Sequence, residues 1–325
     1  MKKIIALLAL LMASALLFFC VTAAAEGMSK NDLIAALSNR EFNFSSGVGG
    51  WGTSLYIGSD GYFFGIYHDS DMGVTGDGYP NGTLYYCPFE GKFSIPEYIP
   101  ADATSVQLTL ESIYYHGLER YGEGAESYGE EIRNGVRLIY SRPYGPNDGR
   151  SFTLYFPQHL RAYTSEEFLS WARWTQSERA DYSEDQLGGY ALCNDSNQQG
   201  FTSHVISDNR SQVNKYIIDV SDQVRRTVSF KGKSVYEMSI ASEEAYRIWD
   251  TALNTIWSVL RNNNSTGSDQ YLLEEETKWI DWKDQSAARE ASKFEGGALY
   301  PLYYYIALAD RTRWRCYDLA SYIYP

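Results

Sequence analysis

The chain has 325 residues, of which 28 are Lys or Arg and 41 are Asp or Glu, so its formal net charge is −13. This charge argues against nucleic acid and anionic membrane as partners and favours cationic ligands. The alternative is that the charge only keeps a surface rich in tyrosine soluble, since the chain contains 28 tyrosines.

Residues 1–25 have the layout of a secretory signal peptide. Two lysines precede an apolar run from Ile4 to Val21, and three alanines end at Ala25. Cleavage after Ala25 predicts a secreted or extracytoplasmic protein of the cell envelope, from a Gram-positive bacterium, that meets the membrane only during export. A retained transmembrane anchor is the alternative. Cys20 follows large residues, where lipid attachment requires small ones, so we expect Cys20 to be removed with the leader.

Residues 26–234 predict a β-rich domain. Asp60-Gly61 lies between the strand-like segments 53–57 and 62–67, and it supplies the positive backbone angles that a tight hairpin turn requires. Apolar and polar residues alternate at 106–111, and the pattern recurs at 136–140 and 152–156. Six or more short antiparallel strands predict a closed barrel or a sandwich, because open edges are hazardous in a secreted protein.

Two shorter helices are expected within this domain. Residues 164–167 form a capping box ahead of an apolar stretch, which predicts a helix across one side or mouth of the sheet. Leu33, Ile34 and Leu37 predict another helix near the start of the mature chain. Residues 219–233 are mixed and basic, and we interpret them as the connection between two domains, with a last strand at 228–230 as one option.

Residues 235–325 predict a second domain of three antiparallel helices. The first carries apolar residues at helical spacing from Ala245 to Leu260. The second begins after Asp269, with Ile280 among its inward residues, and the third opens at Pro301. The fold class is therefore α+β, an N-terminal antiparallel barrel or sandwich followed by a C-terminal antiparallel three-helix domain.

The helical domain carries an ordered string of motif residues: Leu253, Asn254, Trp257, Trp279, Lys283, Asp284, Gly296, Gly297, Arg311, Thr312 and Arg313. In order and spacing this string resembles the LprI-type lysozyme-inhibitor family. The resemblance covers the last quarter of the chain. The sequence differs from many members of the family in one respect, because Gln285 and Ser286 follow the Lys-Asp pair where those members have a cysteine.

The resemblance implies a non-enzymatic protein that binds lysozyme or another cationic cell-wall hydrolase. An acidic, aromatic surface would cover the basic cleft of such an enzyme without covalent chemistry. The motif residues themselves are of kinds that hold helices together: the two tryptophans are apolar anchors, and Asn254 and Asp284 can bridge helices or meet Arg311 or Arg313. We therefore interpret the motif as mainly structural.

Gly50-Trp51, Asp60-Gly61 and Phe64-Gly65 give the start of the β-rich domain a looser likeness to lipocalin-like and avidin-like barrels. Such barrels hold small ligands, so the second hypothesis is a carrier or sensor with a helical docking domain. Its cavity would be lined by Trp51, Tyr56, Phe64 and Tyr67. The alternative is that these aromatic side chains fill the barrel.

Calcium is the one cofactor that the sequence suggests. Asp69, Asp71 and Asp77 lie in a segment with turn-forming glycines, where carboxylates can converge on a hard cation. Asx turns that cap a long hairpin explain the same residues without a metal.

The cysteines of the mature chain predict one disulfide. Cys87 and Cys193 both lie in strand-like segments of the β-rich domain, and an oxidising compartment would allow them to pair. Cys316 then stays a buried thiol on a helix.

No set of residues in the sequence has the spacing of a catalytic motif. His116, His159 and His204 are scattered, and the sequence contains no nucleophile elbow, zinc-binding helix motif or phosphate-binding loop. The acidic cluster at 123–131 lies in a Gly-rich loop, where carboxylates are usually solvated. The sequence therefore predicts a binding protein and no enzyme.

Overall fold

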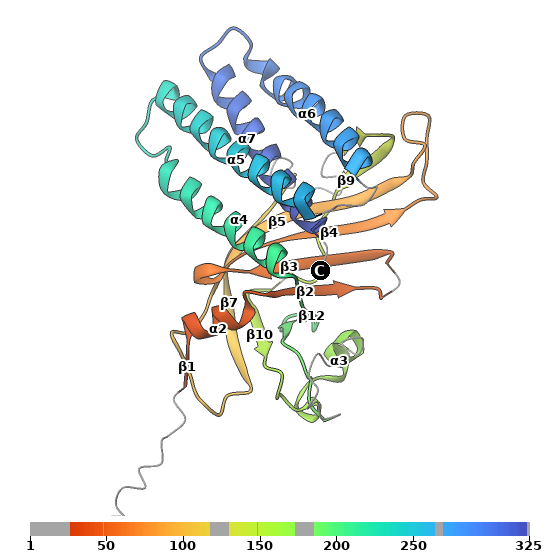
Figure 1. The fold of residues 1–325 in the computed structure, drawn as a ribbon, viewed down its shortest axis with the longest axis vertical. Coiled ribbons are helices and arrows are strands. Elements are labelled where there is room, and N and C mark those ends of the chain that lie inside the picture. Colours follow the sequence, from red (N-terminus) through yellow and green to blue (C-terminus); the bar gives the residue numbers. More distant parts are fainter. Residues whose placement is uncertain are drawn as a thin grey trace, which may run out of the picture.

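The computed structural model describes residues 27–47, 49–117, 130–147, 149–172, 185–263 and 269–323. A β-barrel forms the N-terminal part, and a bundle of helices lies against one of its outer sides (Figure 1). The predicted leader at 1–25, Cys20 and most of the acidic cluster at 123–131 lie outside the described residues.

Eight of the described strands close into an antiparallel barrel. They are β2 (Arg40–Ser45), β3 (Trp51–Ile57), β4 (Tyr62–Asp71), β5 (Thr83–Ser94), β7 (Ser105–Tyr115), β10 (Ser151–Tyr155), β11 (Ala191–Asn194) and β12 (Gly200–Val205). Each pairs with the next in this order, and β12 pairs with β2 to complete the circle. This up-and-down closure leaves no open edge among the eight strands, and it confirms the predicted antiparallel barrel.

Several short elements extend the barrel. Strand β9 (Val136–Tyr140) pairs in parallel with the first half of β5, and β8 (Glu130–Arg133) pairs with β9. Strands β1 (Met28–Ser29) and β6 (Tyr98–Ile99) form a separate two-stranded sheet. The two predicted short helices are α2 (Lys30–Leu37), which begins with a capping box at Ser29, and α3 (Glu166–Ala172).

The hairpin turn between β3 and β4 forms where the sequence predicts it. Asp60 and Gly61 both have positive φ angles, of 53° and 78°. A Cβ atom on Gly61 would lie 2.2 Å from the carbonyl oxygen of Phe93, so the turn has room only for glycine. The turn fixes the register in which Tyr56 lies opposite Phe64.

Apolar side chains of the described residues fill the interior of the barrel. The cluster includes Phe42, Leu55, Phe63, Phe89, Phe93, Leu108, Phe152, Leu154, Leu192 and Phe201, each almost fully buried. Gly65 leaves the space that the Phe89 ring occupies, since a Cβ there would lie 2.3 Å from that ring. The described interior is therefore a packed core, which gives the carrier hypothesis no support.

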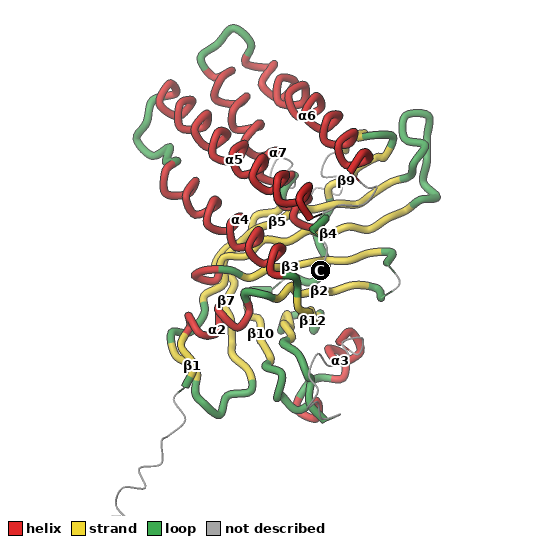
Figure 2. Tube along the Cα trace, viewed as in Figure 1, coloured by secondary structure: helices red, strands yellow, loops and turns green. Residues whose placement is uncertain are grey.

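The C-terminal part contains the helices α4 (Asp208–Thr227), α5 (Val235–Asn263), α6 (Asp269–Ala291) and α7 (Leu299–Ser321). Sequence neighbours in this set run in opposite directions (Figure 2). The interpretation of 219–233 as a connection with a strand at 228–230 is wrong, because α4 occupies the segment through Thr227. Its buried residues Val213, Ile217 and Val220 do have helical spacing, but polar neighbours hide the pattern.

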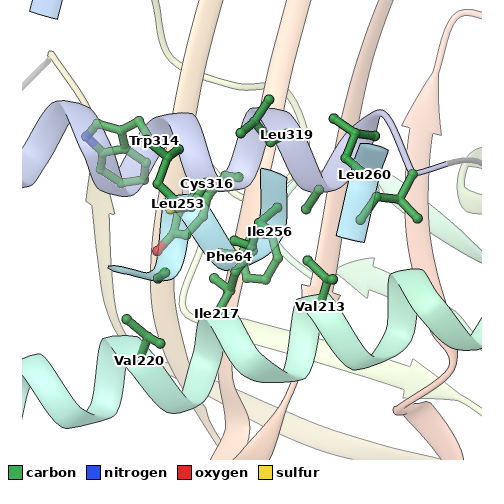
Figure 3. Close-up of a cluster of buried hydrophobic side chains, with 14 of the residues drawn as sticks. Phe64, Val213, Ile217, Val220, Leu253, Ile256, Leu260, Trp314, Cys316 and Leu319 are labelled. Atoms are coloured by element: carbon green, nitrogen blue, oxygen red, sulfur yellow. The ribbon is translucent and has the colours of Figure 1, made fainter. Parts of the chain in front are cut away.

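The bundle and the barrel share one apolar core. Phe64 of β4 points outward from the barrel into a cluster with Ile217 of α4, Ile256 of α5 and Leu319 of α7 (Figure 3). Because this cluster is continuous, the helices are held as a layer on the outer faces of β3, β4, β5 and β7. None of the described helices combines the length and the apolar composition needed to cross a membrane.

Candidate functional site

The motif tryptophans and their neighbours hold the helices together. Trp279 and Leu253 are buried in the bundle core, and Trp257 is half-buried against the same cluster. Lys283 is also buried, and its ammonium group donates a hydrogen bond of 2.9 Å to the Tyr246 hydroxyl of α5. These residues are structural, as the sequence predicts.

The motif on α7 joins three parts of the molecule. Arg311 reaches α6, where its guanidinium donates to Ser286 and lies 3.1 Å from Glu290 Oε2. Thr312 is fully buried and donates to the carbonyl oxygen of Leu308. Arg313 reaches the barrel, because its Nη1 donates to Glu90 Oε1 at 2.7 Å. The motif therefore fixes α7 on both α6 and β5.

Two motif residues do not make the contacts expected of them. Asn254 is exposed and donates to the carbonyl oxygen of Asp250 in its own helix. Asp284 is exposed and lies 3.3 Å from Lys283, without meeting Arg311 or Arg313. The expectation that these residues bridge helices is wrong. Gly296 and Gly297 form the loop between α6 and α7, and the φ angle of 76° at Gly296 is one that glycine adopts easily.

A second set of polar contacts lies between α7 and the barrel. The Tyr317 hydroxyl donates to Glu90 Oε2 at 2.6 Å, and the Tyr86 hydroxyl donates to Asp318. His116 Nδ1 of the barrel lies 3.0 Å from Asp310 Oδ2. Together with Arg313 and Glu90, these groups form the junction network. Sequence reasoning missed this network because its partners are more than 190 residues apart.

Arg315 of α7 is a buried cation that lies between α7 and α6, next to the junction network. Its guanidinium contacts Glu275 at 3.2 Å and Glu276 at 2.8 Å, and Asp318 lies 3.9 Å away. Burial raises the pKa of the Asp318 carboxyl, because the loss of water outweighs the attraction of the one guanidinium that it shares with Glu275 and Glu276. Burial likewise raises the pKa of Glu276. One buried guanidinium therefore balances only part of the negative charge of these three carboxylates. All of these contacts are internal to the protein.

The three histidines that are scattered in the sequence do not form one site in the structure either. His116 meets Asp310, His159 Nδ1 lies 2.9 Å from the Thr104 hydroxyl, and His204 Nδ1 lies 2.9 Å from the amide of Asn43. These pairings are in different parts of the barrel, so the three imidazoles do not face a common point.

The four aromatic residues proposed as a ligand cavity lie on two sides of the barrel wall. Trp51 and Tyr67 both pack against Tyr144, with ring centroids 5.1 and 5.4 Å apart, on the inner side of the wall. Tyr56 and Phe64 point outward under the helices. The prediction that they line one cavity is wrong, because consecutive residues of a strand alternate between the faces of the sheet.

The proposed calcium ligands do not converge. Among the described residues, no group of three or more His, Cys, Asp and Glu side chains is placed to hold a metal ion. Asp71 Oδ1 accepts a hydrogen bond of 3.1 Å from the backbone N–H of Gly73, which is the turn geometry offered above as the alternative for this segment.

The predicted disulfide between Cys87 and Cys193 is also wrong, since both are buried free thiols. Cys87 packs with Tyr67 and Tyr140, whereas Cys193 packs with Phe168 of α3. Their clusters lie on opposite sides of the barrel wall, and the sequence does not reveal which side each strand residue faces. Cys316 is a buried free thiol on α7, as expected.

The outer side of α6 combines apolar and acidic groups. Tyr271, Leu273 and Ile280 are 69%, 43% and 45% exposed. Glu274, Asp281 and Asp284 of the same helix are also exposed, as is Lys278. Tyr271 and Ile280 are nine residues apart, which places them on opposite sides of the helix. We refer to Leu273, Glu274, Ile280, Asp281 and Asp284 as the acidic face of α6. The sequence interpretation placed Ile280 inward, but Trp279 and Lys283 occupy the buried positions of these turns.

A recess of about 280 Å3 lies at the junction, on the side of α6 that carries Tyr271. Glu275 and Asp318 line it together with the cations Arg133 and Arg315, so its charges are mixed. The acidic face of α6 is the surface better suited to a basic protein partner.

Comparison with known families agrees with the resemblance of the helical part. The model of the family described as lysozyme inhibitor LprI matches residues 229–319, which include α5, α6 and most of α7. Searches of the curated proteins and of the solved structures found no match to the chain. The barrel lies outside the matched residues.

Proposed function

We propose that the chain is a secreted or envelope-associated bacterial binding protein that inhibits a lysozyme or another cationic cell-wall hydrolase by non-covalent occlusion. The family match supports this proposal, because the family model that matches residues 229–319 is described as a lysozyme inhibitor. The charge supports it too: the formal charge of −13 attracts a basic partner over distances longer than a contact.

The acidic face of α6 is the observation that carries the proposal. It lies inside the family-matched residues, and it is the outward side of a helix whose inward side carries Leu272, Trp279 and Lys283. The buried motif residues, such as Leu253, Trp279 and Lys283, cannot themselves meet a partner without leaving the core. Leu273 and Ile280 can supply desolvated anchors, while the neighbouring carboxylates pair with Arg or Lys.

The barrel gives the acidic face a rigid support. Arg313 and Tyr317 fasten α7 to Glu90, and Arg311 and Arg315 fasten α6 to α7. A contact on α6 therefore needs little ordering of the inhibitor on binding, which lowers the entropic cost of association. Occlusion of this kind needs no covalent step and no cofactor.

A wall-lysis assay tests the proposal. The mature chain, added at micromolar concentration to bacterial cells and a cationic lysozyme, should slow the fall in turbidity. Raising the salt concentration should relieve the inhibition, because the long-range attraction is screened within about 8 Å at 0.15 M ionic strength and within less at higher salt. Unchanged lysis at every protein concentration would refute inhibition of that hydrolase.

A further inference from the structure

One segment of this acidic protein is strongly basic. Residues 225–233, which end α4 and form the loop to α5, contain Arg225, Arg226, Lys231 and Lys233 and no acidic residue. Arg226 lies 2.7 Å from Asp222, but Lys231 makes no ion pair with any described residue. The proposed hydrolase site does not use this segment, and its charge is opposite to that of the whole chain.

Exposed apolar side chains lie beside these cations. Phe230, at the tip of the loop, is 42% exposed, and Tyr236 and Ile240 in the first turns of α5 are 75% and 50% exposed. Because the protein already has a packed core, the exposure of a large apolar side chain at a loop tip does not stabilise the folded protein. Such residues next to lysines are typical of surfaces that enter the interfacial region of a membrane.

The loop between α6 and α7 lies at the same end of the bundle (Figure 1). Phe230 and Ile306 of α7 line one recess, and Tyr246 of α5 packs with Ala287 of α6 and Tyr305 of α7. This second loop region adds Arg289 and Lys293, both exposed, and the partly exposed Leu299. We call the two loops together the loop end of the bundle.

We propose that the loop end of the bundle docks on an anionic phospholipid membrane. Its lysines and arginines would meet the lipid phosphates, and Phe230 would enter the interface between headgroups and acyl chains. Apolar and cationic groups side by side favour a membrane over a purely polar anionic polymer, because such a polymer offers no apolar layer to Phe230.

The negative charge of the whole chain does not prevent this docking. Most acidic residues of the loop end are engaged: Glu237 accepts hydrogen bonds from Ser234, Asp222 pairs with the arginines, and Glu290 pairs with Arg311. Glu295 is exposed in the second loop. Acidic residues farther than a Debye length, about 8 Å at physiological ionic strength, are largely screened from the membrane. The cations of the loop end can therefore attract an anionic membrane, although the net charge of the whole chain is negative.

Vesicle flotation with the purified mature chain tests this proposal. Vesicles of phosphatidylglycerol and phosphatidylcholine should carry the protein at low salt, and vesicles of phosphatidylcholine alone should not. The variant R226E/K231E/K233E should lose at least about 100-fold in vesicle affinity, since each cation near an anionic surface contributes about fivefold. F230S should weaken binding without changing the charge.

The matched control reverses three exposed cations elsewhere, in the variant R150E/K215E/K278E. This control changes the net charge equally and should keep most of the binding. Circular dichroism would show that all variants stay folded. Three results would overturn the proposal: no binding to anionic vesicles, equal losses in both triple variants, or binding to an anionic wall polymer in the absence of binding to vesicles.

Discussion

The Tyr317 hydroxyl of α7 donates a hydrogen bond to Glu90 Oε2 of β5 at 2.6 Å, while the Tyr317 ring stacks on Phe64 at a centroid distance of 4.5 Å. Glu90 also accepts a hydrogen bond from Arg313, so one carboxylate of the barrel holds two side chains of the bundle. The two parts of the molecule are thus joined by a polar contact inside an apolar layer.

Removal of this contact should destabilise the protein. Tyr317→Phe deletes one hydrogen bond to a charged acceptor and should lower the free energy of unfolding by about 1 to 2 kcal/mol. Glu90→Gln leaves the Arg313 charge with Asp310 alone and should cost more, about 2 to 4 kcal/mol. Urea denaturation would measure both. Tyr271→Phe, which removes an exposed hydroxyl, should change stability by less than about 0.5 kcal/mol; equal effects of all three would contradict the structure.

The buried carboxylate of Asp318 should make part of the stability depend on pH. Its pKa is raised above the ordinary value of 3.8, so the folded state binds its proton more tightly than the unfolded state does. This contribution is fully present below 3.8 and is lost as the pH rises through the raised pKa. Relative to Asp318→Asn, the wild type should therefore become more stable between pH 7 and pH 4. Urea denaturation at several pH values would measure it, and a difference that stayed constant or grew with rising pH would argue against a raised pKa.

The thiols should be free and protected. Burial raises the pKa of Cys193 to about 12 and raises the pKa of Cys87 further, so neither forms a reactive thiolate at neutral pH. A chain that begins at Glu26 should show three alkylated cysteines after denaturation without reductant, and almost none while folded. The melting temperature should not change with dithiothreitol. A count of one alkylated cysteine by mass spectrometry would instead indicate that Cys87 and Cys193 form a disulfide.

A substitution of the motif lysine, Lys283, would distinguish a structural role of the family residues from a role in binding. Lys283→Met removes the hydrogen bond to Tyr246 and should cost about 1 to 2 kcal/mol of unfolding free energy. It should leave hydrolase binding unchanged, because Lys283 faces inward. Calorimetry of the folded variant with a lysozyme would check this. Lost binding with unchanged stability would place Lys283 in the binding surface.

Much of the fold follows from local patterns in the sequence. The alternation at 106–111 and the Asp60-Gly61 turn predict antiparallel strands, and the spacing from Ala245 to Leu260 predicts α5. Helix α4 was missed for a local reason too: its apolar residues are separated by charges, and its mixed composition resembles a connection.

The contacts between distant segments could not be predicted in this way. Arg313 and Glu90 are 223 residues apart, and no local pattern pairs them. The side of the barrel wall toward which Cys87 and Cys193 point depends on the strand register within the closed barrel, which the sequence leaves open. The same limitation affected Ile280, because a helical stripe does not show which of two adjacent positions the bundle buries.

Direct measurement of binding between the mature chain and a cationic lysozyme tests the central claim. Isothermal titration calorimetry would compare the wild type with the acidic-face variant E274K/I280S/D281K and with the control D77K/D102K, which reverses two exposed carboxylates of the barrel. Wild type and control should bind, and the acidic-face variant should bind on the order of 100-fold more weakly. Absence of binding by the wild type, or equal affinities for all three proteins, would contradict the account.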